Sequence, residues 1–435
     1  MKSQRIKPLH PTAGKQRCSI LDVLYAGYAA EAAFVFPQRL DPERLARSLS
    51  QVLSDFPTYA GRLSVRRDGF DILHDADGAL FEHVETQSSL AELITAIKAE
   101  RPREVCPYVS VGAMMFRGAA LFCVRLTNAP DGAVIGIRCN HMMGDLNSLM
   151  LLLRAWAAAY GERPYVKPLI APDQDAYLSE HLPDIPGARP AWRVGSWREL
   201  AEFAYATAKP AARQDLVFPK ATVKKIREAY STHASVSTND AVSAHLYSII
   251  RHFQQPTTPN NLCITLNYRS RAGLPDNLVG NLVTVVAQPV GVKMDAAATA
   301  AGLRRQLDEF GTKGIHFHAT RRALEARPGW LQRIRTFSEY FQPGRGDFMV
   351  GNWRGFDLYG IPFGDIVPTM YWAFAGAPAW NAGIGDAADG DGLLVILFLP
   401  KKLSRLLQSK EARALLFDRI DVPRPVAEQQ LQASL

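Results

Sequence analysis

A proline-rich stretch divides the sequence, and on both sides of it segments typical of strands alternate with segments typical of helices. Within residues 163–213, prolines recur at Pro164, Pro168, Pro172, Pro183, Pro186, Pro190 and Pro210. Proline removes a backbone donor and fixes φ, so it is rare inside helices and central strands. The stretch therefore predicts a long crossover between two folded bodies, with a short helix near residues 197–207. The alternation on either side favours a layered α/β architecture in each body.

The first half contains one clearly delimited helix and two apolar strands. Asp41-Pro42 is a capping residue followed by proline at the first helical position, and apolar residues then recur at helical spacing. Apolar runs at residues 120–126 and 133–139 are typical of buried strands. After the second strand, residues 145–148 (DLNS) can cap a long apolar helix over residues 149–160.

The second half continues the alternation. Ser237 or Thr238 can cap a helix whose apolar face runs from Val242 to Phe253. Strand candidates are residues 262–268, 282–289, 348–353 and 393–399. The 435 residues are enough for two or three domains, or for one large two-lobed enzyme.

Composition excludes several classes of protein. Hydrophobic residues make up 47% and charged residues 21%, as in a globular protein with a large core. No window approaches the roughly 18 consecutive apolar residues of a membrane span. The first residues are basic and polar with no apolar stretch behind them, so we expect no secretory signal and a cytoplasmic location. The five scattered cysteines form no C-x-x-C pair, which argues against disulfides and a structural zinc site.

The net charge of +8 permits an anionic partner. Lys and Arg residues are dispersed along the chain and are not concentrated in a tail or a stripe, so we expect no nucleic-acid partner. This net positive charge would equally favour binding of a small molecule that bears phosphate groups. The sequence contains no G-x-x-x-x-G-K-[ST], no G-x-G-x-x-G and no G-x-S-x-G, so neither a phosphate-cradling loop nor a serine nucleophile is predicted.

His141 and Asp145 form an H-x-x-x-D sequence between the second buried strand and the helix that follows it. A side chain at a strand end is held rigidly at the edge of a sheet, where a substrate can reach it. Histidine is the usual proton acceptor near neutral pH, because its unperturbed pKa is about 6.5. Taken alone, the two residues also fit a histidine satisfied within the fold and an aspartate that caps a helix.

Further segments, in the same order along the chain, resemble those of the BAHD acyltransferases, relatives of chloramphenicol acetyltransferase. Ser19-Ile20-Leu21-Asp22 resembles the opening S-x-x-D of the family, and residues 45–63 (LARSLSQVLSDFPTYAGRL) are similar to its helix followed by P-x-A-G-R-L. Residues 236–252 (VSTNDAVSAHLYSIIRH) resemble the helix of the second lobe. Residues 266–286 (LNYRSRAGLPDNLVGNLVTVV) and 348–365 (FMVGNWRGFDLYGIPFGD) resemble the R-x-R to G-N stretch and the approach to the second signature. The chain is identified as a divergent member of this family.

The resemblance implies two similar lobes, each a mixed β-sheet covered by helices, joined by the crossover segment. We expect the first lobe over residues 1–185 with the H-x-x-x-D sequence, the crossover over residues 186–212 and the second lobe over residues 213–435. A solvent channel between the lobes would admit the donor from one face and the acceptor from the other, with His141 near its middle. Because one chain supplies both lobes, we expect a monomer.

The resemblance also assigns roles. His141 would act as general base toward a hydroxyl or amine of a small acceptor as that group attacks an acyl-CoA thioester. Asp145 would point away from the substrate and pair with Arg269, which would hold the loop that bears His141; the other interpretation of Arg269 is a plain surface arginine. Acyl-CoA would be a cosubstrate, with no permanently bound cofactor and no metal. Such an enzyme would serve secondary metabolism, and its acyl group and acceptor are left open.

Other residues are assigned to the channel or to acyl-CoA binding. Ser237 and Thr238 either approach the pantetheine arm or only cap their helix. The oxyanion of the tetrahedral intermediate needs a hydrogen-bond donor, for which the candidates are a backbone N–H near Gly144 and a side chain around Trp353 or Trp372. The remaining channel positions that the resemblance implies are Asn281 and Thr284.

Departures from the family pattern leave alternatives open. The signature D-F-G-W-G is here residues 362–366 (PFGDI), and Leu146 replaces the glycine that commonly follows the H-x-x-x-D aspartate. The signature is structural in the family, so its loss puts the loop shape in doubt, not the chemistry. One alternative is a condensation enzyme that takes acyl groups from a carrier protein, but such enzymes usually show H-H-x-x-x-D-G and the first position here is Asn140. The other is a catalytically inactive binding protein on the same fold.

Overall fold

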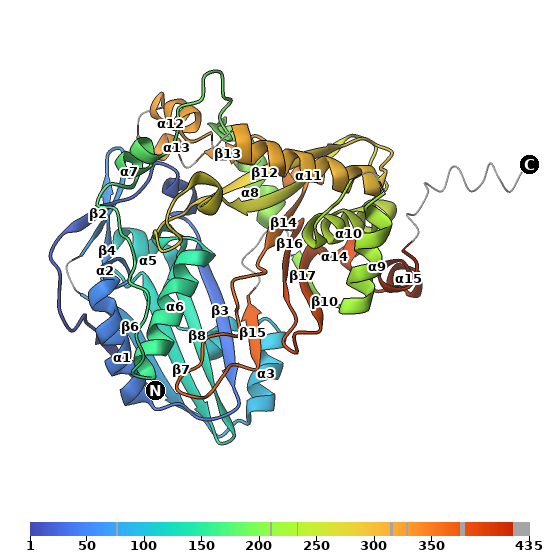
Figure 1. The fold of residues 1–435 in the computed structure, drawn as a ribbon. Coiled ribbons are helices and arrows are strands. Elements are labelled where there is room, and N and C mark those ends of the chain that lie inside the picture. Colours follow the sequence, from blue (N-terminus) through green and yellow to red (C-terminus); the bar gives the residue numbers. More distant parts are fainter. Residues whose placement is uncertain are drawn as a thin grey trace, which may run out of the picture.

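The computed structural model describes residues 1–74, 77–208, 211–232, 234–313, 316–327, 329–333, 335–374 and 379–420. Two bodies lie side by side, each built on a six-stranded sheet (Figure 1). The strand order of the first sheet is β1 (Lys2–Ile6), β6 (Ala79–Glu85), β7 (Phe122–Ala129), β8 (Gly132–Asn140), β3 (Ala29–Phe36) and β15 (Met370–Ala373). That of the second is β10 (Ala211–Pro219), β17 (Gly392–Pro400), β16 (Asn381–Asp386), β14 (Phe348–Asn352), β11 (Asn260–Asn267) and β12 (Val283–Val290).

Both sheets combine parallel and antiparallel neighbours. In the first sheet β6 and β7 run parallel, and in the second β14 runs parallel to β11 and to β16, while the other pairs are antiparallel. The predicted fold of two similar lobes, each a mixed sheet covered by helices, is confirmed. Two smaller sheets are formed by β2 (Lys15–Arg17), β5 (Gly69–Leu73) and β4 (Arg62–Arg66), and by β13 (Thr336–Ser338) and β9 (Trp192–Val194).

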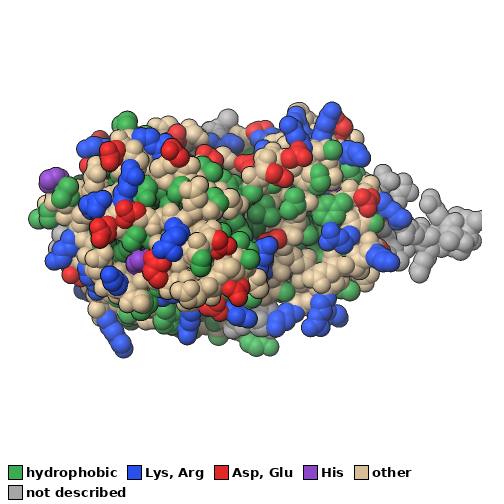
Figure 2. All heavy atoms as spheres, turned by 90° about the horizontal axis from the view of Figure 1, so that it is seen from below, with side chains coloured by type: hydrophobic (Ala, Val, Ile, Leu, Met, Phe, Trp, Pro, Cys, Tyr) green, Lys and Arg blue, Asp and Glu red, His purple; other side chains and the backbone are tan. Residues whose placement is uncertain are grey.

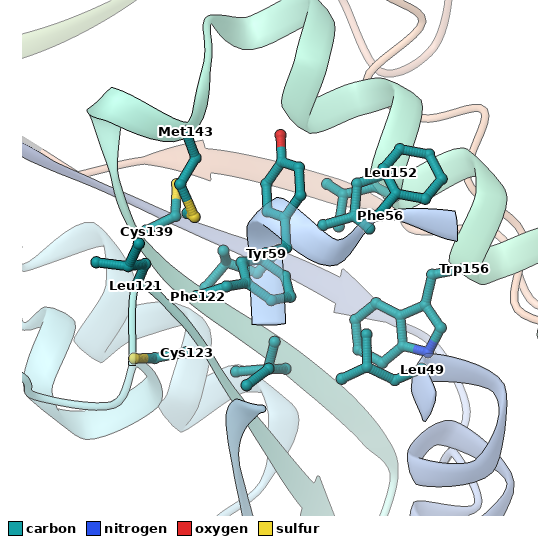
Figure 3. Close-up of a cluster of buried hydrophobic side chains, with 14 of the residues drawn as sticks. Leu49, Phe56, Tyr59, Leu121, Phe122, Cys123, Cys139, Met143, Leu152 and Trp156 are labelled. Atoms are coloured by element: carbon teal, nitrogen blue, oxygen red, sulfur yellow. The ribbon is translucent and has the colours of Figure 1, made fainter. Parts of the chain in front are cut away.

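The core of the first lobe lies between its sheet and the helices α1 (Pro42–Asp55) and α6 (Leu146–Tyr160). Helix α1 begins where the sequence predicts, because Asp41 accepts a hydrogen bond from the Glu43 N–H at 2.8 Å ahead of the first turn. Side chains from α1, α6, β7 and β8 meet in this core (Figure 3). Trp156 of α6 is fully buried there, and its indole N–H donates to the backbone carbonyl of Leu45 in α1 at 3.0 Å.

The remaining helical segments connect or cover the sheets. Up to the start of α6 they are η1 (Asp22–Tyr25), α2 (Pro57–Ala60), α3 (Leu90–Lys98), α4 (Pro102–Val105), α5 (Val111–Phe116) and η2 (His141–Met143). Between α6 and β10 lie α7 (Gln174–His181) and α8 (Trp197–Ala208). After β10 come α9 (Lys220–Tyr230), α10 (Thr238–Gln254), η3 (Ser270–Ala272), α11 (Ala296–Lys313), α12 (Phe317–Glu325), α13 (Trp330–Arg333), η4 (Pro343–Arg345), α14 (Lys401–Leu406) and α15 (Lys410–Phe417).

Helix α10 is the central helix of the second lobe. Ser237 caps it in a capping box, in which the Ser237 hydroxyl accepts from the Asp240 N–H at 3.2 Å and the Asp240 carboxylate accepts from the Ser237 N–H at 2.8 Å. Every residue from Asn239 to Arg251 is buried. Because α9, α11, α14 and α15 all contact it, α10 has no face left for solvent over this length.

Strand β15 joins the first sheet although it comes late in the sequence. It pairs antiparallel with β3, so the chain returns to the first lobe after building most of the second (Figure 1). Tyr371 faces the core, where its ring lies 5.1 Å from that of Phe34, whereas Trp372 faces the opposite side of the sheet with residues of α3. A strand of four residues carries too little alternation to be found from sequence. The lobe boundaries at residues 185 and 212 stay predictions.

The surface agrees with the dispersed charge of the sequence. On the face drawn in Figure 2, Lys and Arg side chains are scattered among Asp and Glu side chains over both lobes. Over the described part of the chain, no helix combines the length and the apolar composition that crossing a membrane requires.

The altered signature at residues 362–366 still anchors its loop to the first lobe. Phe363 is 1% exposed, and its ring makes edge contacts with Phe36, Trp156 and Tyr160 at 5.7, 5.0 and 5.5 Å between centroids. The residues on either side of the Phe-Gly pair differ from the family pattern, but the Phe363 ring still makes its aromatic contacts with the first lobe.

Phe363→Ala is expected to lower the free energy of unfolding by about 3–5 kcal/mol, because it empties a site closed by three aromatic rings. Val367→Ala, four positions along the same loop and 51% exposed, is the matched control and should change it by less than about 0.5 kcal/mol. Urea denaturation followed by fluorescence measures both. Equal stability of the two variants would contradict the anchoring role.

Candidate active site between the lobes

The H-x-x-x-D sequence lies where β8 ends. Asn140 is the last residue of β8, His141 opens η2 and Asp145 caps α6. The Asn140 side chain is fully buried and spans the turn: its Oδ1 accepts from the Met142 N–H at 2.9 Å and its Nδ2 donates to the Ala26 carbonyl at 3.2 Å. The turn that carries His141 is therefore tied to the segment next to η1 before any substrate binds.

The Asn281 amide joins His141 to the second half of the chain. Asn281 Nδ2 donates to Asp22 Oδ1 at 2.8 Å and to the His141 carbonyl at 2.9 Å, which uses both of its protons. Asn281 Oδ1 lies 3.0 Å from His141 Nδ1 and can only accept there, so Nδ1 carries the imidazole proton. The lone pair of the neutral imidazole is therefore on Nε2, the atom that can take a proton from another molecule.

Two tyrosine rings enclose the imidazole. Tyr25 stacks on His141 with 4.5 Å between ring centroids and 13° between planes, and Tyr28 lies at 5.6 Å in a tilted contact. Burial against these rings removes water from the imidazole and lowers the pKa of His141 below its ordinary value of 6.5. His141 is consequently neutral at pH 7 and able to accept a proton.

Asp22 ends the chain of hydrogen bonds behind His141. Its carboxyl is 1% exposed and accepts from Asn281 and, at 2.8 Å, from the Ser19 N–H, but no cation of the described residues pairs with it. Burial is the main cause that raises the pKa of Asp22 to about 7, against the lowering effect of these hydrogen bonds. Asp22 therefore places a carboxyl group of raised pKa two hydrogen bonds away from the His141 imidazole.

Asp145 and Arg269 form a buried ion pair. Arg269 Nη1 lies 2.7 Å from Asp145 Oδ2 and Nη2 lies 3.1 Å from Oδ1, and both side chains are at most 3% exposed. Asp145 also accepts from the N–H groups of Ser148 and Leu282, each at 3.0 Å. Arg269 further donates to the Gly280 carbonyl at 2.9 Å. The pair thus ties the start of α6 to the loop before β12, which carries Asn281.

Two glycines allow the turn that bears His141 and the loop that carries Asn281 to approach each other closely. Gly144 and Gly280 have φ of +143° and +151°, and the Asp145 N–H donates to the Gly280 carbonyl at 3.2 Å. A Cβ on Gly280 would lie 1.9 Å from the Gln174 amide nitrogen, and one on Gly144 would lie 2.6 Å from Ser148 Cβ. At both positions a larger residue would be strained by the positive φ and would displace a neighbouring side chain, Gln174 at Gly280 and Ser148 at Gly144.

The predicted oxyanion donors differ in what they already bind. The Gly144 N–H donates to the carbonyl of His141 at 3.3 Å, and the Trp372 indole donates to Glu100 at 2.9 Å on the far side of the first sheet. The structure does not bring Trp372 together with His141. Trp353 follows β14 and packs edge-on against Tyr371 at 6.4 Å, and its indole N–H donates to no residue that the structure describes.

The remaining positions that the sequence assigned to the channel or to acyl-CoA binding are Thr284 and two residues at the start of α10. Thr284 lies in β12, three residues beyond Asn281, and is 8% exposed. Ser237 is the cap of α10, whereas Thr238 lines a hollow of 980 Å³ between α9, α10 and the turn that joins β16 to β17. The cationic side chains that line this hollow are Lys220, Lys224, Arg227 and Arg354.

Sequence reasoning missed the aromatic part of the site. No motif marks Tyr25 or Tyr28, and the S-x-x-D segment showed only that Asp22 belongs to a family pattern. Its contact with Asn281 joins residues 259 positions apart, which no local pattern can reveal. Within the residues that the structure describes, no group of three or more His, Cys, Asp or Glu side chains could hold a metal ion.

The family model named Transferase family matches residues 1–411. The chain therefore belongs to this family, that of the BAHD acyltransferases. No curated protein sequence matches the chain.

Solved structures are similar in fold. Vinorine synthase aligns with a TM-score of 0.74 and 19% identity over 97% of this chain and 98% of its own. TRI101 of F. graminearum, solved with coenzyme A and T-2 mycotoxin, aligns with a TM-score of 0.75 and 14% identity over 92% and 98%. The first condensation domain of the CDA synthetase aligns with a TM-score of 0.60 and 14% identity over 96% and 98%. At these identities the likeness shows the shared fold alone.

Arg269→Met is expected to lower the free energy of unfolding by about 3–5 kcal/mol, because it leaves Asp145 buried without its counterion. The double variant Asp145→Leu, Arg269→Met removes both charges and should recover much of that loss. Urea denaturation measures both, with Arg271→Met, exposed and two positions away, as the control. Additive losses in the double variant would contradict the coupling of the two side chains.

Proposed function

We propose that the protein transfers an acyl group from an acyl-CoA thioester to a hydroxyl or amine of a small-molecule acceptor, with His141 Nε2 as general base. The observation that carries this proposal is the hydrogen bond from His141 Nδ1 to Asn281, which leaves Nε2 unprotonated. Family membership supports acyl transfer as the reaction. TRI101 structures solved with coenzyme A and T-2 mycotoxin or deoxynivalenol support the coenzyme and a small acceptor as the two ligands.

In the proposed reaction, His141 Nε2 takes the proton of the acceptor as the acceptor oxygen or nitrogen bonds to the thioester carbonyl carbon. The carbonyl electron pair moves to its oxygen, which gives a tetrahedral oxyanion. The C–S bond then breaks, the sulfur leaves with the electron pair, and it takes the proton from the imidazolium. The products are the acylated acceptor, coenzyme A and neutral His141. General-base help of this kind is worth about 10²–10⁴ in rate.

The surrounding residues would stabilise the charges of this reaction. Asn281 keeps its acceptor oxygen on Nδ1–H when His141 becomes an imidazolium, and the ionised form of Asp22 behind it adds a negative charge in a buried site. For the oxyanion we favour the Trp353 indole N–H, because the other candidate donors already make hydrogen bonds. We propose a monomer as the active form, because both lobes belong to one chain.

We place the phosphates of the coenzyme in the 980 Å³ hollow beside Thr238. Lys220, Lys224 and Arg227 from α9 and Arg354 after β14 bring four cations to its lining. Two of them are partly compensated, since Arg354 pairs with Asp386 at 3.0 Å and Lys224 with Glu228 at 3.8 Å. The start of the 17-residue helix α10 adds the positive end of its dipole.

One residue argues against the alternative of a condensation enzyme that takes acyl groups from a carrier protein. Asn140 occupies the position of the first histidine in H-H-x-x-x-D-G, where its amide accepts from the Met142 N–H and donates to the Ala26 carbonyl. A protein that only binds acyl-CoA would keep the same contacts without turnover, so activity has to separate it from an enzyme.

The proposal is tested by thiol release from a panel of acyl-CoA thioesters with hydroxylated and amine acceptors. We expect release that needs an acceptor and falls by about 10²–10⁴ in His141→Ala, with His10→Ala, an exposed histidine, as the matched control. Because the pKa of His141 is lowered, kcat/KM should fall below pH 6.5 as the imidazole becomes protonated.

Three other results would exclude the proposal. Acyl-CoA binding by calorimetry without turnover would favour the inactive binding protein. Turnover only with an acyl carrier protein would favour the condensation enzyme. Turnover that survives in His141→Ala would exclude the assigned base.

The coenzyme site makes a separate prediction. In the double variant Lys220→Met, Lys224→Met we expect the KM for acyl-CoA to rise about tenfold with kcat unchanged, because the removed charges bind the coenzyme equally in the ground and transition states. The effect should shrink at high salt. Lys98→Met, an exposed lysine of α3, is the control. A loss of kcat with unchanged KM would contradict this assignment.

A further inference from the structure

A second charged hollow, of 320 Å³, shares no lining residue with the one beside Thr238. It is enclosed by β2 and the residues after it, the turn between β4 and β5, α7, and the region of α12 and α13. Four carboxylates line it together with five arginines, Arg17, Arg66, Arg67, Arg321 and Arg333. The hollow thus holds one more cation than anions.

Most of these arginines are held by the carboxylates of the hollow. Arg17 and Arg66 both pair with Asp68 at 2.9 Å, and Arg321 pairs with Glu325 at 2.7 Å. These contacts orient the side chains around the opening and neutralise most of their charge.

Arg333 is different, because it is buried without a counterion. It is 7% exposed, forms no ion pair with any described residue, and donates from Nη1 to the backbone carbonyl of Asp68. Its Nε is buried and has no hydrogen-bond partner. Desolvation lowers the pKa of Arg333, against the raising effect of the Asp68, Glu325 and Asp175 carboxylates, none of which forms an ion pair with it. Arg67 beside the opening is exposed and likewise has no ion-pair partner among the described residues.

A buried cation and a buried unpaired N–H both cost free energy unless a partner arrives. We propose that this hollow is a binding site for a small anion, the carboxylate or phosphate group of an acidic small molecule, which Arg333 binds from the floor and Arg67 from the rim. Such a group supplies acceptor oxygens for the planar guanidinium and balances the excess charge. This binding does not depend on the proposed acyl transfer.

The wall of the hollow continues into the hydrogen bonds behind His141. Ser19 lines the hollow, and its N–H donates to Asp22 at 2.8 Å while its hydroxyl donates to Asp175 at 2.6 Å. The Ile20 N–H donates to the other oxygen of Asp175 at 2.9 Å. The anion site therefore borders the segment that positions Asp22.

The test is calorimetry and thermal unfolding of the full chain with two separate probes, inorganic phosphate and succinate, at constant ionic strength. We expect saturable binding of at least one probe, and the probe that binds tells a phosphate site from a carboxylate site. Arg333→Met should weaken that binding at least about tenfold, the loss expected for a charged hydrogen-bonded contact. Without ligand, this variant should be as stable as the wild type or more stable, because it removes a buried charge that no ion pair and only one hydrogen bond holds.

Two further variants keep the test decisive. Arg67→Met removes an exposed side chain, so it should fold normally and still weaken binding. Arg47→Met, whose arginine is 70% exposed on α1, should bind like the wild type. The proposal is overturned if neither probe saturates, if Arg333→Met and Arg67→Met bind like Arg47→Met, or if coenzyme A displaces the bound probe, which would place the coenzyme's phosphates here.

Discussion

The site depends on the buried ion pair of Asp145 and Arg269, which joins residues 124 positions apart. Two charges taken out of water are tolerated only where every lone pair and proton finds a partner, and here backbone N–H and carbonyl groups supply the remaining bonds. The same backbone segments carry His141 on one side and Asn281 on the other. The ion pair therefore determines how the His141 imidazole meets the Asn281 amide that fixes its tautomer.

The chemistry of His141 follows from its surroundings more than from its place in the motif. Stacking on Tyr25 and burial lower its pKa, and the Asn281 amide selects the free nitrogen. Asp22 then places a carboxyl group of raised pKa behind that amide. Burial and the Asn281 contact together give a neutral imidazole whose lone pair is on Nε2.

Much of the architecture could be predicted from local patterns. Asp41-Pro42 marks the start of α1, Ser237 the start of α10, and the apolar runs before His141 correspond to β7 and β8. These features depend on neighbours within a few residues, where capping and periodicity act. Strand β15 could not be predicted, because its four residues owe their conformation to pairing with β3, more than 330 positions earlier.

The sequence by itself determined the alternating α/β organisation, the H-x-x-x-D turn between strand and helix, and the family resemblance that made Arg269 and Asn281 candidates. Only the tertiary structure decided that Arg269 contacts Asp145 and that Asn281 contacts His141. It also decided that Trp372 lies on the far face of its sheet and that Arg333 is buried without an ion pair to any described residue. The reason is physical. Periodicity and capping are local, whereas burial, desolvation and the pairing of charges arise when segments distant in sequence pack together.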